Sequence, residues 1–423
     1  MYPVRRCVAA VLAIAWCVAG CAPHEATSSA TPAASPEAPP PATGPATQPA
    51  ESAVPPSPSA DLYAVPDPLP PGEPGELIRL ERVAAPAGAV AWRVLYQSRT
   101  IAGTDIAVSG LIVAPDEAPP PGGFPVLAYA HGTTGLADAC ALSKRVQPFP
   151  SGADGAPSLP LPELWTRGYV VAATDYEGLG TPGRHPYLVG ESEGRGVLDI
   201  VRAARSIEDA HAGARTVAIG VSQGGHAALF TGEIAPAYAP DVDLVAVVAL
   251  APAAELAQAA FLLTGDESVV GFAVAIGAGF AAAHAEADLG QILTPAALAA
   301  IDIVDTGCID DVLAAYAGPV HRTLRFDALG APPWPTLLER NSPGRVRTDV
   351  PLFVGQGDAD PLVVPELTDA LVVRLCALGD DVTYRRYTGA SHNSVVEAAQ
   401  DDVFGWIDDR LAGRPTGQGD CPR

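Results

Sequence analysis

Positive charge is scarce in this chain. Its 423 residues include 25 basic and 48 acidic side chains, which gives a net charge of −23, and only one basic residue, Lys144, is a lysine. Proteins that bind nucleic acid neutralise its phosphates with clustered lysine and arginine. The composition therefore excludes nucleic acid as an expected partner.

Apolar runs long enough to span a membrane are also missing. Two arginines precede the apolar run 7–18, which is too short to span a membrane and predicts a signal peptide over residues 1–21. The run leads into Val-Ala-Gly-Cys, which resembles a bacterial lipobox. This pattern predicts an exported protein attached to the outer face of the cell membrane through an acylated Cys21. A secreted protein cleaved near Ala22 is the alternative.

Residues 22–60 lack lysine, arginine, leucine, isoleucine and every aromatic residue, and consist mainly of proline, alanine, serine and threonine. A segment of this composition has almost nothing bulky and apolar to bury. It predicts a disordered, extended tether between the membrane and a folded part.

Cysteine is sparse as well. Seven are present, and four lie beyond the predicted signal: Cys140, Cys308, Cys376 and Cys421. An even number in an exported chain favours disulfides over a metal site, and no two of them have the spacing of a C-x-x-C ligand pair. We therefore expect disulfides, whose connectivity the spacing leaves open, and neither a metal nor a cofactor.

Short apolar runs typical of strands alternate with helical segments beyond residue 61. The expected strands are 90–96, 106–113, 124–130, 169–174, 217–219, 244–250 and 351–354, and the expected helices include 195–212, 225–234 and 365–377. This alternation is typical of parallel crossover units. We expect an α/β fold in which a mostly parallel central sheet, with an antiparallel start, is covered by helices on both faces.

One interval breaks this alternation. About a hundred residues separate the sixth expected strand from the next, far more than a crossover connection needs. The stretch 255–283 is almost wholly apolar, and 295–316 is helical in pattern. We therefore expect a helical cap, 255–347, inserted after the sixth strand between two core segments, 61–254 and 348–423. Its apolar composition would suit an apolar substrate, although mutual packing of the cap helices would also explain it.

A serine lies at the junction of an expected strand and helix. Residues 220–224 read Gly-Val-Ser-Gln-Gly, with Ser222 at the centre. In this context the G-x-S-x-G pattern is typical of a nucleophile elbow, a tight turn that exposes the hydroxyl to a base. An ordinary turn could match so short a pattern, so the interpretation depends on whether partners for the serine follow in the chain.

Those partners follow in the expected order. His392 lies in a loop after the last strand-like run, where an imidazole can reach Ser222 as a base. The acid should follow the preceding strand, where the chain offers Asp360 and, as an alternative, Asp358. The order Ser, Asp, His is that of α/β-hydrolases, which favours this set of residues.

Two backbone N–H groups are candidates for stabilising the oxyanion. One belongs to Gln223, directly after the serine. The other lies in the loop that begins with His131 and Gly132, where Thr133 is the first candidate and Thr134 the alternative. A glycine there allows a backbone N–H to face the substrate without an intervening side chain.

At this point the chain resembles a known family, the secretory lipases typified by fungal lipase A, within the α/β-hydrolases. The resemblance covers nearly all of the chain after residue 61. It rests on the acidic loop 174–180, the turn at Asn341, and the segment from Asp360 to His392. The oxyanion loop at His131 departs from that of the fungal members.

The resemblance implies several further properties. It favours Asp360 over Asp358 as the acid. It implies that Cys140 pairs with Cys308 and that Cys376 pairs with Cys421. It also implies the α/β-hydrolase fold and lipid ester substrates.

The residues and the resemblance together predict an exported serine hydrolase of carboxylic esters, of the lipase or carboxylesterase type, that cleaves acylglycerols or other lipid esters through an acyl-enzyme. One alternative is a peptidase or amidase that uses the same three residues, because a triad does not specify the leaving group. A tethered lipid-binding protein with a vestigial triad is the other. The oligomeric state stays open.

Overall fold

The structure is a computed structural model that describes residues 61–145, 161–263, 267–325, 329–416 and 419–421. The predicted signal peptide, Cys21 and the predicted tether lie outside these ranges. Within them, no helix combines the length and the apolar composition needed to cross a membrane.

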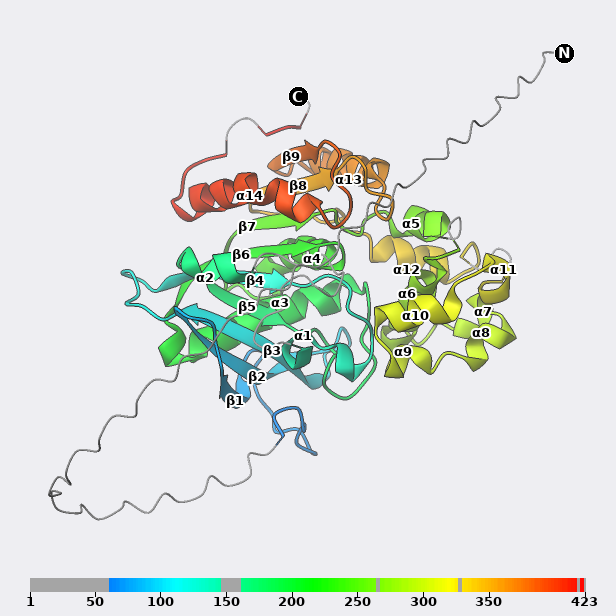
Figure 1. Cartoon of the computed structure of the whole chain (residues 1–423), viewed down its shortest axis with the longest axis horizontal. Coiled ribbons are helices and arrows are strands. Elements are labelled where there is room, and N and C mark those ends of the chain that lie inside the picture. The colour runs from blue at the N-terminus through cyan, green and yellow to red at the C-terminus, as the bar shows by residue number, and fades with distance from the viewer. Residues whose placement is uncertain (1–60, 146–160, 264–266, 326–328, 417–418, 422–423) are drawn as a thin grey trace, which may run out of the picture. The chain divides into compact units, whose positions relative to one another are not determined.

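The centre of the fold is a nine-stranded sheet in the order β1-β2-β3-β5-β4-β6-β7-β8-β9 (Figure 1). The pairs from β1 to β3, and the pair of β3 with β5, are antiparallel, and all others are parallel. The strands are β1 (Leu77–Val83), β2 (Ala89–Arg99), β3 (Asp105–Pro115), β4 (Phe124–Ala130), β5 (Val170–Thr174), β6 (Ala212–Val221), β7 (Asp243–Leu250), β8 (Leu352–Gly357) and β9 (Val382–Tyr387). The predicted mostly parallel α/β sheet with an antiparallel start is confirmed.

The structure has one more N-terminal strand than the sequence predicted. β1 lies at the edge of the sheet, pairs only with β2, and has no buried residue. Its mixed polar and apolar sequence therefore lacks the signature of a core strand. The prediction that the insertion follows the sixth strand was wrong by one, since 244–250 belongs to the seventh strand, β7.

Helices cover both faces of the sheet. Alternate residues of β4 separate into two cores: Val126 and Ala128 contribute to the first, and Leu127 and Tyr129 to the second. Burial on both faces explains why this strand is an unbroken apolar run. Outside the insertion the helices are α1 (Leu142–Arg145), α2 (Leu161–Thr166), α3 (Gly190–Ser206), α4 (Gln223–Tyr238), α13 (Pro365–Leu378) and α14 (Val395–Leu411), with short 3-10 helices at Asp138–Cys140 and Glu208–Ala210.

Between β7 and β8 the described residues form a set of helices with a core of their own, built around Phe280 and Trp334. Figure 1 shows these helices gathered on one side of the sheet. The two ends of the insertion meet, because the N–H of Leu256 donates to Ser342 Oγ at 2.9 Å. The helices are α5 (Leu256–Leu263), α6 (Val270–Ala283), α7 (Leu289–Ile292), α8 (Pro295–Ala299), α9 (Ile303–Thr306), α10 (Ile309–Tyr316), α11 (Val320–Thr323) and α12 (Trp334–Arg340).

Two disulfides join distant parts of the chain. Cys140 pairs with Cys308 and Cys376 pairs with Cys421, the same pairs that the resemblance implied. The first bond connects the insertion to the loop after β4. Beside it, the N–H of Ile309 donates to the carbonyl of Thr134 at 3.0 Å. One side of the insertion is therefore attached to the loop that contains the candidate oxyanion threonines.

Candidate active site

Ser222 occupies the turn between β6 and α4 in a backbone conformation that non-glycine residues rarely adopt, with φ of 59° and ψ of −120°. Its N–H donates to the carbonyl of Leu250 at the end of β7, at 2.9 Å. Strain of this kind is typical of functional turns held by their surroundings. The hydroxyl is consequently presented at the carboxyl edge of the sheet.

The two glycines of the motif are required by close backbone contacts. A Cβ at Gly224 would lie 1.9 Å from the carbonyl oxygen of Ala130, and a Cβ at Gly220 would lie 2.3 Å from the backbone of Gly224. Any side chain would therefore push the turn away from β4. The packing explains why the serine is flanked by residues without a β-carbon.

His392 and Asp360 are in direct contact. The distance from His392 Nδ1 to Asp360 Oδ2 is 2.7 Å, and the carboxylate is fully buried. Its other oxygen accepts the N–H groups of Leu362 and Val363, each at 2.9 Å. These hydrogen bonds hold the carboxylate in place beside the imidazole. A buried anion on Nδ1 sets the orientation and tautomer that leave Nε2 free to act as a base.

Asp358, the alternative acid, is exposed and contacts the backbone of the loop rather than the imidazole. Its carboxylate accepts the N–H of Gly389 at 2.6 Å, and its own N–H donates to the carbonyl of Tyr387. It thereby braces the loop that leads to His392. Of the two aspartates, only Asp360 contacts the imidazole in the described structure.

The second ring nitrogen of His392, Nε2, is buried and has no hydrogen-bond partner among the described residues. The serine–histidine hydrogen bond is thus not formed in this structure. In unliganded hydrolases this contact is often long and tightens when substrate binds. An unpartnered buried nitrogen is also costly for stability, which is typical of a group kept for chemistry.

The loop after β4 contains both candidate oxyanion threonines. Thr133 Oγ1 lies 2.8 Å from the hydroxyl of Tyr187, whereas Thr134 is buried and its carbonyl is bound to the insertion. Gln223 is the first residue of α4, so its N–H has no acceptor within the helix. The N–H groups of Gln223 and of one of the threonines remain the candidate donors.

His131 is a structural part of this loop. Its ring is buried, its Nδ1 donates to the carbonyl of Gly132 at 2.7 Å, and it packs against Tyr176. Burial lowers the pKa of His131, so the ring is neutral. The hydrogen bond to Gly132 stabilises the conformation of this loop.

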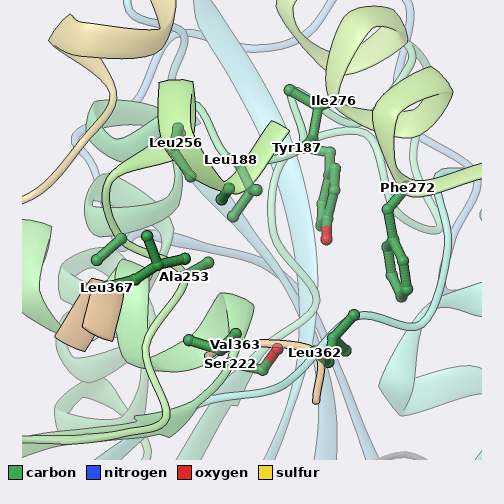
Figure 2. Close-up of a pocket in the computed structure, with 12 residues that line it drawn as sticks. Tyr187, Leu188, Ser222, Ala253, Leu256, Phe272, Ile276, Leu362, Val363 and Leu367 are labelled. Carbon is green, nitrogen blue, oxygen red and sulfur yellow. The ribbon is translucent and has the colours of Figure 1, made fainter. Parts of the chain in front are cut away.

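A small apolar pocket opens at Ser222. Its lining comes from the loop before α3, the segment after β7, the insertion helices, the loop after β8 and the start of α13: Tyr187, Leu188, Ala253, Ala254, Leu256, Ala259, Phe272, Ile276, Leu362, Val363 and Leu367. Figure 2 shows the Tyr187 ring reaching into the space near Ser222, Leu362 and Val363. The cavity volume is about 50 Å³, against the roughly 10–15 Å³ that one water requires.

Sequence reasoning missed three residues of the site. Gln356 in β8 donates to Asp360 Oδ2 at 3.1 Å, Tyr187 contacts Thr133, and the buried Glu193 of α3 binds the side chain of Gln223 at 2.8 Å. Nothing in their local sequence marks them. Each reaches the site through a contact between segments that are distant in the chain.

Comparisons with known proteins agree on one family and one fold. A family model described as secretory lipase matches residues 155–419. A protein from Mycobacterium tuberculosis named a probable inactive lipase is 26% identical over 344 residues, which cover 78% of this chain and 75% of that protein. Among solved structures, lipase A of Candida antarctica in its closed state has a TM-score of 0.74 at 18% identity, covering 86% of this chain and 88% of that one. The rice cell wall degrading esterase of Xanthomonas oryzae has a TM-score of 0.66 at 18% identity, covering 81% of this chain and 100% of that one.

Proposed function

Because the chain belongs to the secretory lipase family of α/β-hydrolases, we propose that it is an exported serine hydrolase that cleaves the carboxylic ester bonds of lipids. The observation that carries the proposal is the buried hydrogen bond between Asp360 and His392, at the same sheet edge as a serine in a strained elbow. An apolar pocket at that serine supports a lipid substrate.

The reaction begins when Ser222 Oγ attacks the ester carbonyl carbon while His392 Nε2 takes the hydroxyl proton. The tetrahedral oxyanion accepts hydrogen bonds from the backbone N–H groups of Gln223 and Thr133, with Thr134 as the alternative second donor. The carbon–oxygen bond to the alcohol then breaks, and the imidazolium protonates the leaving alcohol. Water, deprotonated by His392, attacks the acyl-enzyme and releases the acid and the free serine.

Asp360 acts through His392 by stabilising the imidazolium that forms in each step. Gln356 supports this carboxylate and is itself held by the hydroxyl of Thr368, which donates to Gln356 Oε1 at 2.7 Å. Tyr187 contributes a neutral hydroxyl beside Thr133, because burial raises the pKa of this phenol. We assign Tyr187 a supporting role in holding the oxyanion loop.

The pocket favours short acyl groups. A cavity of about 50 Å³ holds a few water molecules, and Phe272 and Ile276 of α6 form one wall. Apart from Ser222 and the Tyr187 hydroxyl, the lining side chains are apolar and cannot pair with the charged or amide groups of a peptide, which favours esters of lipids over amides.

A panel of substrates with a common chromophore tests this proposal. We expect p-nitrophenyl esters to be hydrolysed, with kcat/KM highest for acyl groups of about two to six carbons because longer chains exceed the cavity. Aminoacyl p-nitroanilides should react slowly or not at all. Faster hydrolysis of the anilides would replace the esterase proposal with a peptidase or amidase.

The wall at Phe272 provides a variant for the same panel. Phe272→Ala should enlarge the pocket and move the preference toward longer esters, by about 10-fold in relative kcat/KM. Each methylene of the acyl chain that an apolar pocket accommodates contributes about 1–3 kcal/mol to discrimination between substrates. Leu298→Ala is the matched control, because Leu298 also lies in the insertion but is exposed. An unchanged preference in Phe272→Ala would contradict the assignment of this pocket to the acyl chain.

We also propose that the mature chain is anchored outside the cell through acylated Cys21. Family membership and two disulfides support export, and the lipobox-like sequence supports the anchor. Cys21→Ser should move the protein from the membrane fraction to the soluble fraction. Persistence of the variant in the membrane fraction would exclude this anchor.

A lipid-binding protein without activity is the competing proposal, since one relative is named a probable inactive lipase. In such a protein, substitutions at the candidate triad and its supporting contacts would carry no cost to function. The intact contacts of Asp360 with His392, Leu362 and Val363 argue for activity. Covalent capture by a fluorophosphonate separates the two proposals, because only an activated serine reacts.

A further inference from the structure

A carboxylate lies buried behind the nucleophile turn. Glu193 of α3 is fully buried and has three hydrogen-bond partners. Its Oε1 accepts the N–H of Leu188 at 3.0 Å and the side-chain Nε2–H of Gln223 at 2.8 Å, and its Oε2 lies 2.6 Å from His226 Nδ1. Gln223 and His226 are one and four residues beyond Ser222 on α4. One carboxylate thus holds the first turn of the helix that begins at the serine.

His226 faces an acceptor on each side. Its Nδ1 meets the Glu193 carboxylate, and its Nε2 lies 2.8 Å from the backbone carbonyl of Asn341, which can only accept. Glu193 Oε1 accepts from two further donors, so this oxygen carries no proton. Nε2 therefore donates to Asn341, and one proton lies in the short hydrogen bond between Nδ1 and Glu193 Oε2.

Two titratable groups and one aromatic ring lie close to the pair of Glu193 and His226. Burial lowers the pKa of His185 to about 4, so this neighbouring ring is neutral and its Nε2 accepts from the Gln223 amide at 2.9 Å. Burial also raises the pKa of Glu233 to about 7, so this carboxyl is partly protonated near neutral pH. The ring of Phe230 packs against His226 at 4.8 Å between centroids.

The third partner connects this turn to the insertion. Asn341 directly follows α12, and its side-chain Oδ1 accepts the N–H of Gly190 at 3.1 Å, at the start of α3. The next residue, Ser342, accepts the N–H of Leu256 on its hydroxyl oxygen, and this hydrogen bond joins the two ends of the insertion. The contacts therefore run from α3, through His226 of α4, to the base of the helical insertion.

We propose that Glu193 is a positioning residue, which pairs as a carboxylate with doubly protonated His226 and, through its hydrogen bonds to His226 and Gln223, fixes the first turn of α4 against the base of the insertion. The inference rests on the proposed function, because the turn that it holds contains Ser222 and the oxyanion donor N–H of Gln223. A displacement of that N–H would weaken transition-state stabilisation more than substrate binding.

Steady-state kinetics of two alanine variants test the positioning role. Glu193→Ala should lower kcat by about 10²-fold with KM changed by less than about threefold, since misplacement by about 1 Å costs that much. The matched control is Asp199→Ala, which removes another fully buried carboxylate of α3, bound instead to Ser98 and Tyr238, and should retain kcat. Equal losses of kcat in two variants of equal thermal stability would overturn the proposal.

Glu193→Gln should restore most of the activity. Its amide oxygen can accept from Leu188 and Gln223 while its NH₂ donates to a neutral His226, so the turn stays in place. We expect a kcat within about 10-fold of the wild type. If Glu193→Gln lost as much kcat as Glu193→Ala, the hydrogen bonds to the turn would not explain the role of Glu193 in kcat, and the proposal would be overturned.

The protonation state of His226 is measured directly by NMR of the wild-type protein labelled with ¹⁵N-histidine, with the His226→Asn variant used for assignment. At pH 7 we expect protons on both ring nitrogens, and in Glu193→Gln an unprotonated Nδ1. An unprotonated Nδ1 in the wild type would place the proton on Glu193 and overturn the ion pair. Absence of ester hydrolysis would contradict the proposed function instead, while these ring signals would still test the pair.

Discussion

Replacing Ser222 with alanine is expected to lower the kcat for p-nitrophenyl ester hydrolysis by about 10⁴- to 10⁶-fold. The variant keeps the turn, the pocket and the candidate oxyanion donors, but it has no oxygen to form the acyl-enzyme. The residual rate should reflect binding and the oxyanion donors alone. Initial rates at saturating substrate, measured on folded protein, give the result.

Ser206→Ala is the matched control for this change. Ser206 ends α3, and its hydroxyl donates to the carbonyl of Ala203, one turn earlier in the same helix. This variant should have the rate of the wild type. If Ser222→Ala hydrolysed the ester as fast as Ser206→Ala, another residue would be the nucleophile and the proposed mechanism would be wrong.

Asp360→Asn should have the second-largest effect, with kcat reduced by about 10⁴-fold. The amide keeps the size of the carboxylate but removes the negative charge that stabilises the imidazolium. It also favours the tautomer of His392 in which Nε2 carries the proton and cannot act as a base. The rates of Asp360→Asn and Asp358→Asn should be measured side by side.

Asp358→Asn serves as the comparison within the same loop. Its carboxylate is exposed and contacts Gly389 rather than the imidazole, so we expect a loss of less than about 10-fold. A larger loss in Asp358→Asn than in Asp360→Asn would transfer the role of the acid to Asp358. The structure argues against that outcome, because only Asp360 lies within hydrogen-bonding distance of His392.

Much of the fold could be predicted because the core strands carry a strong signal. β4, β5 and β7 are apolar runs, and burial on both faces of a parallel sheet requires such runs. β1 was missed because an edge strand needs no buried face and its residues are half-buried or exposed. Sequence patterns therefore identify the elements that fill the core better than those at its margins.

The candidate triad could be located from the sequence because chain order and turn context restrict the choice. The elbow glycines mark Ser222, and the loops after two late strands contain the aspartates and His392. The resemblance favoured Asp360 over Asp358, and the contacts support the same choice, because Asp360 is directed toward the imidazole and Asp358 toward the N–H of Gly389.

The supporting residues could not be predicted, because their roles arise from contacts between distant segments. Glu193 lies 33 residues from His226 in the sequence, and Asn341 lies 115 residues from the same ring. His226 lies four residues beyond Ser222, on the helix that follows it. Its position between two acceptors depends on how α3, α4 and the end of the insertion pack together.

The central claim, that Ser222 is an activated nucleophile, is tested most directly by mass spectrometry after reaction with a fluorophosphonate. The account predicts that the wild-type protein gains one adduct, located on the peptide that contains Ser222, and that Ser222→Ala gains none. Folded wild-type protein that remains unmodified, or an adduct on another residue, would contradict it.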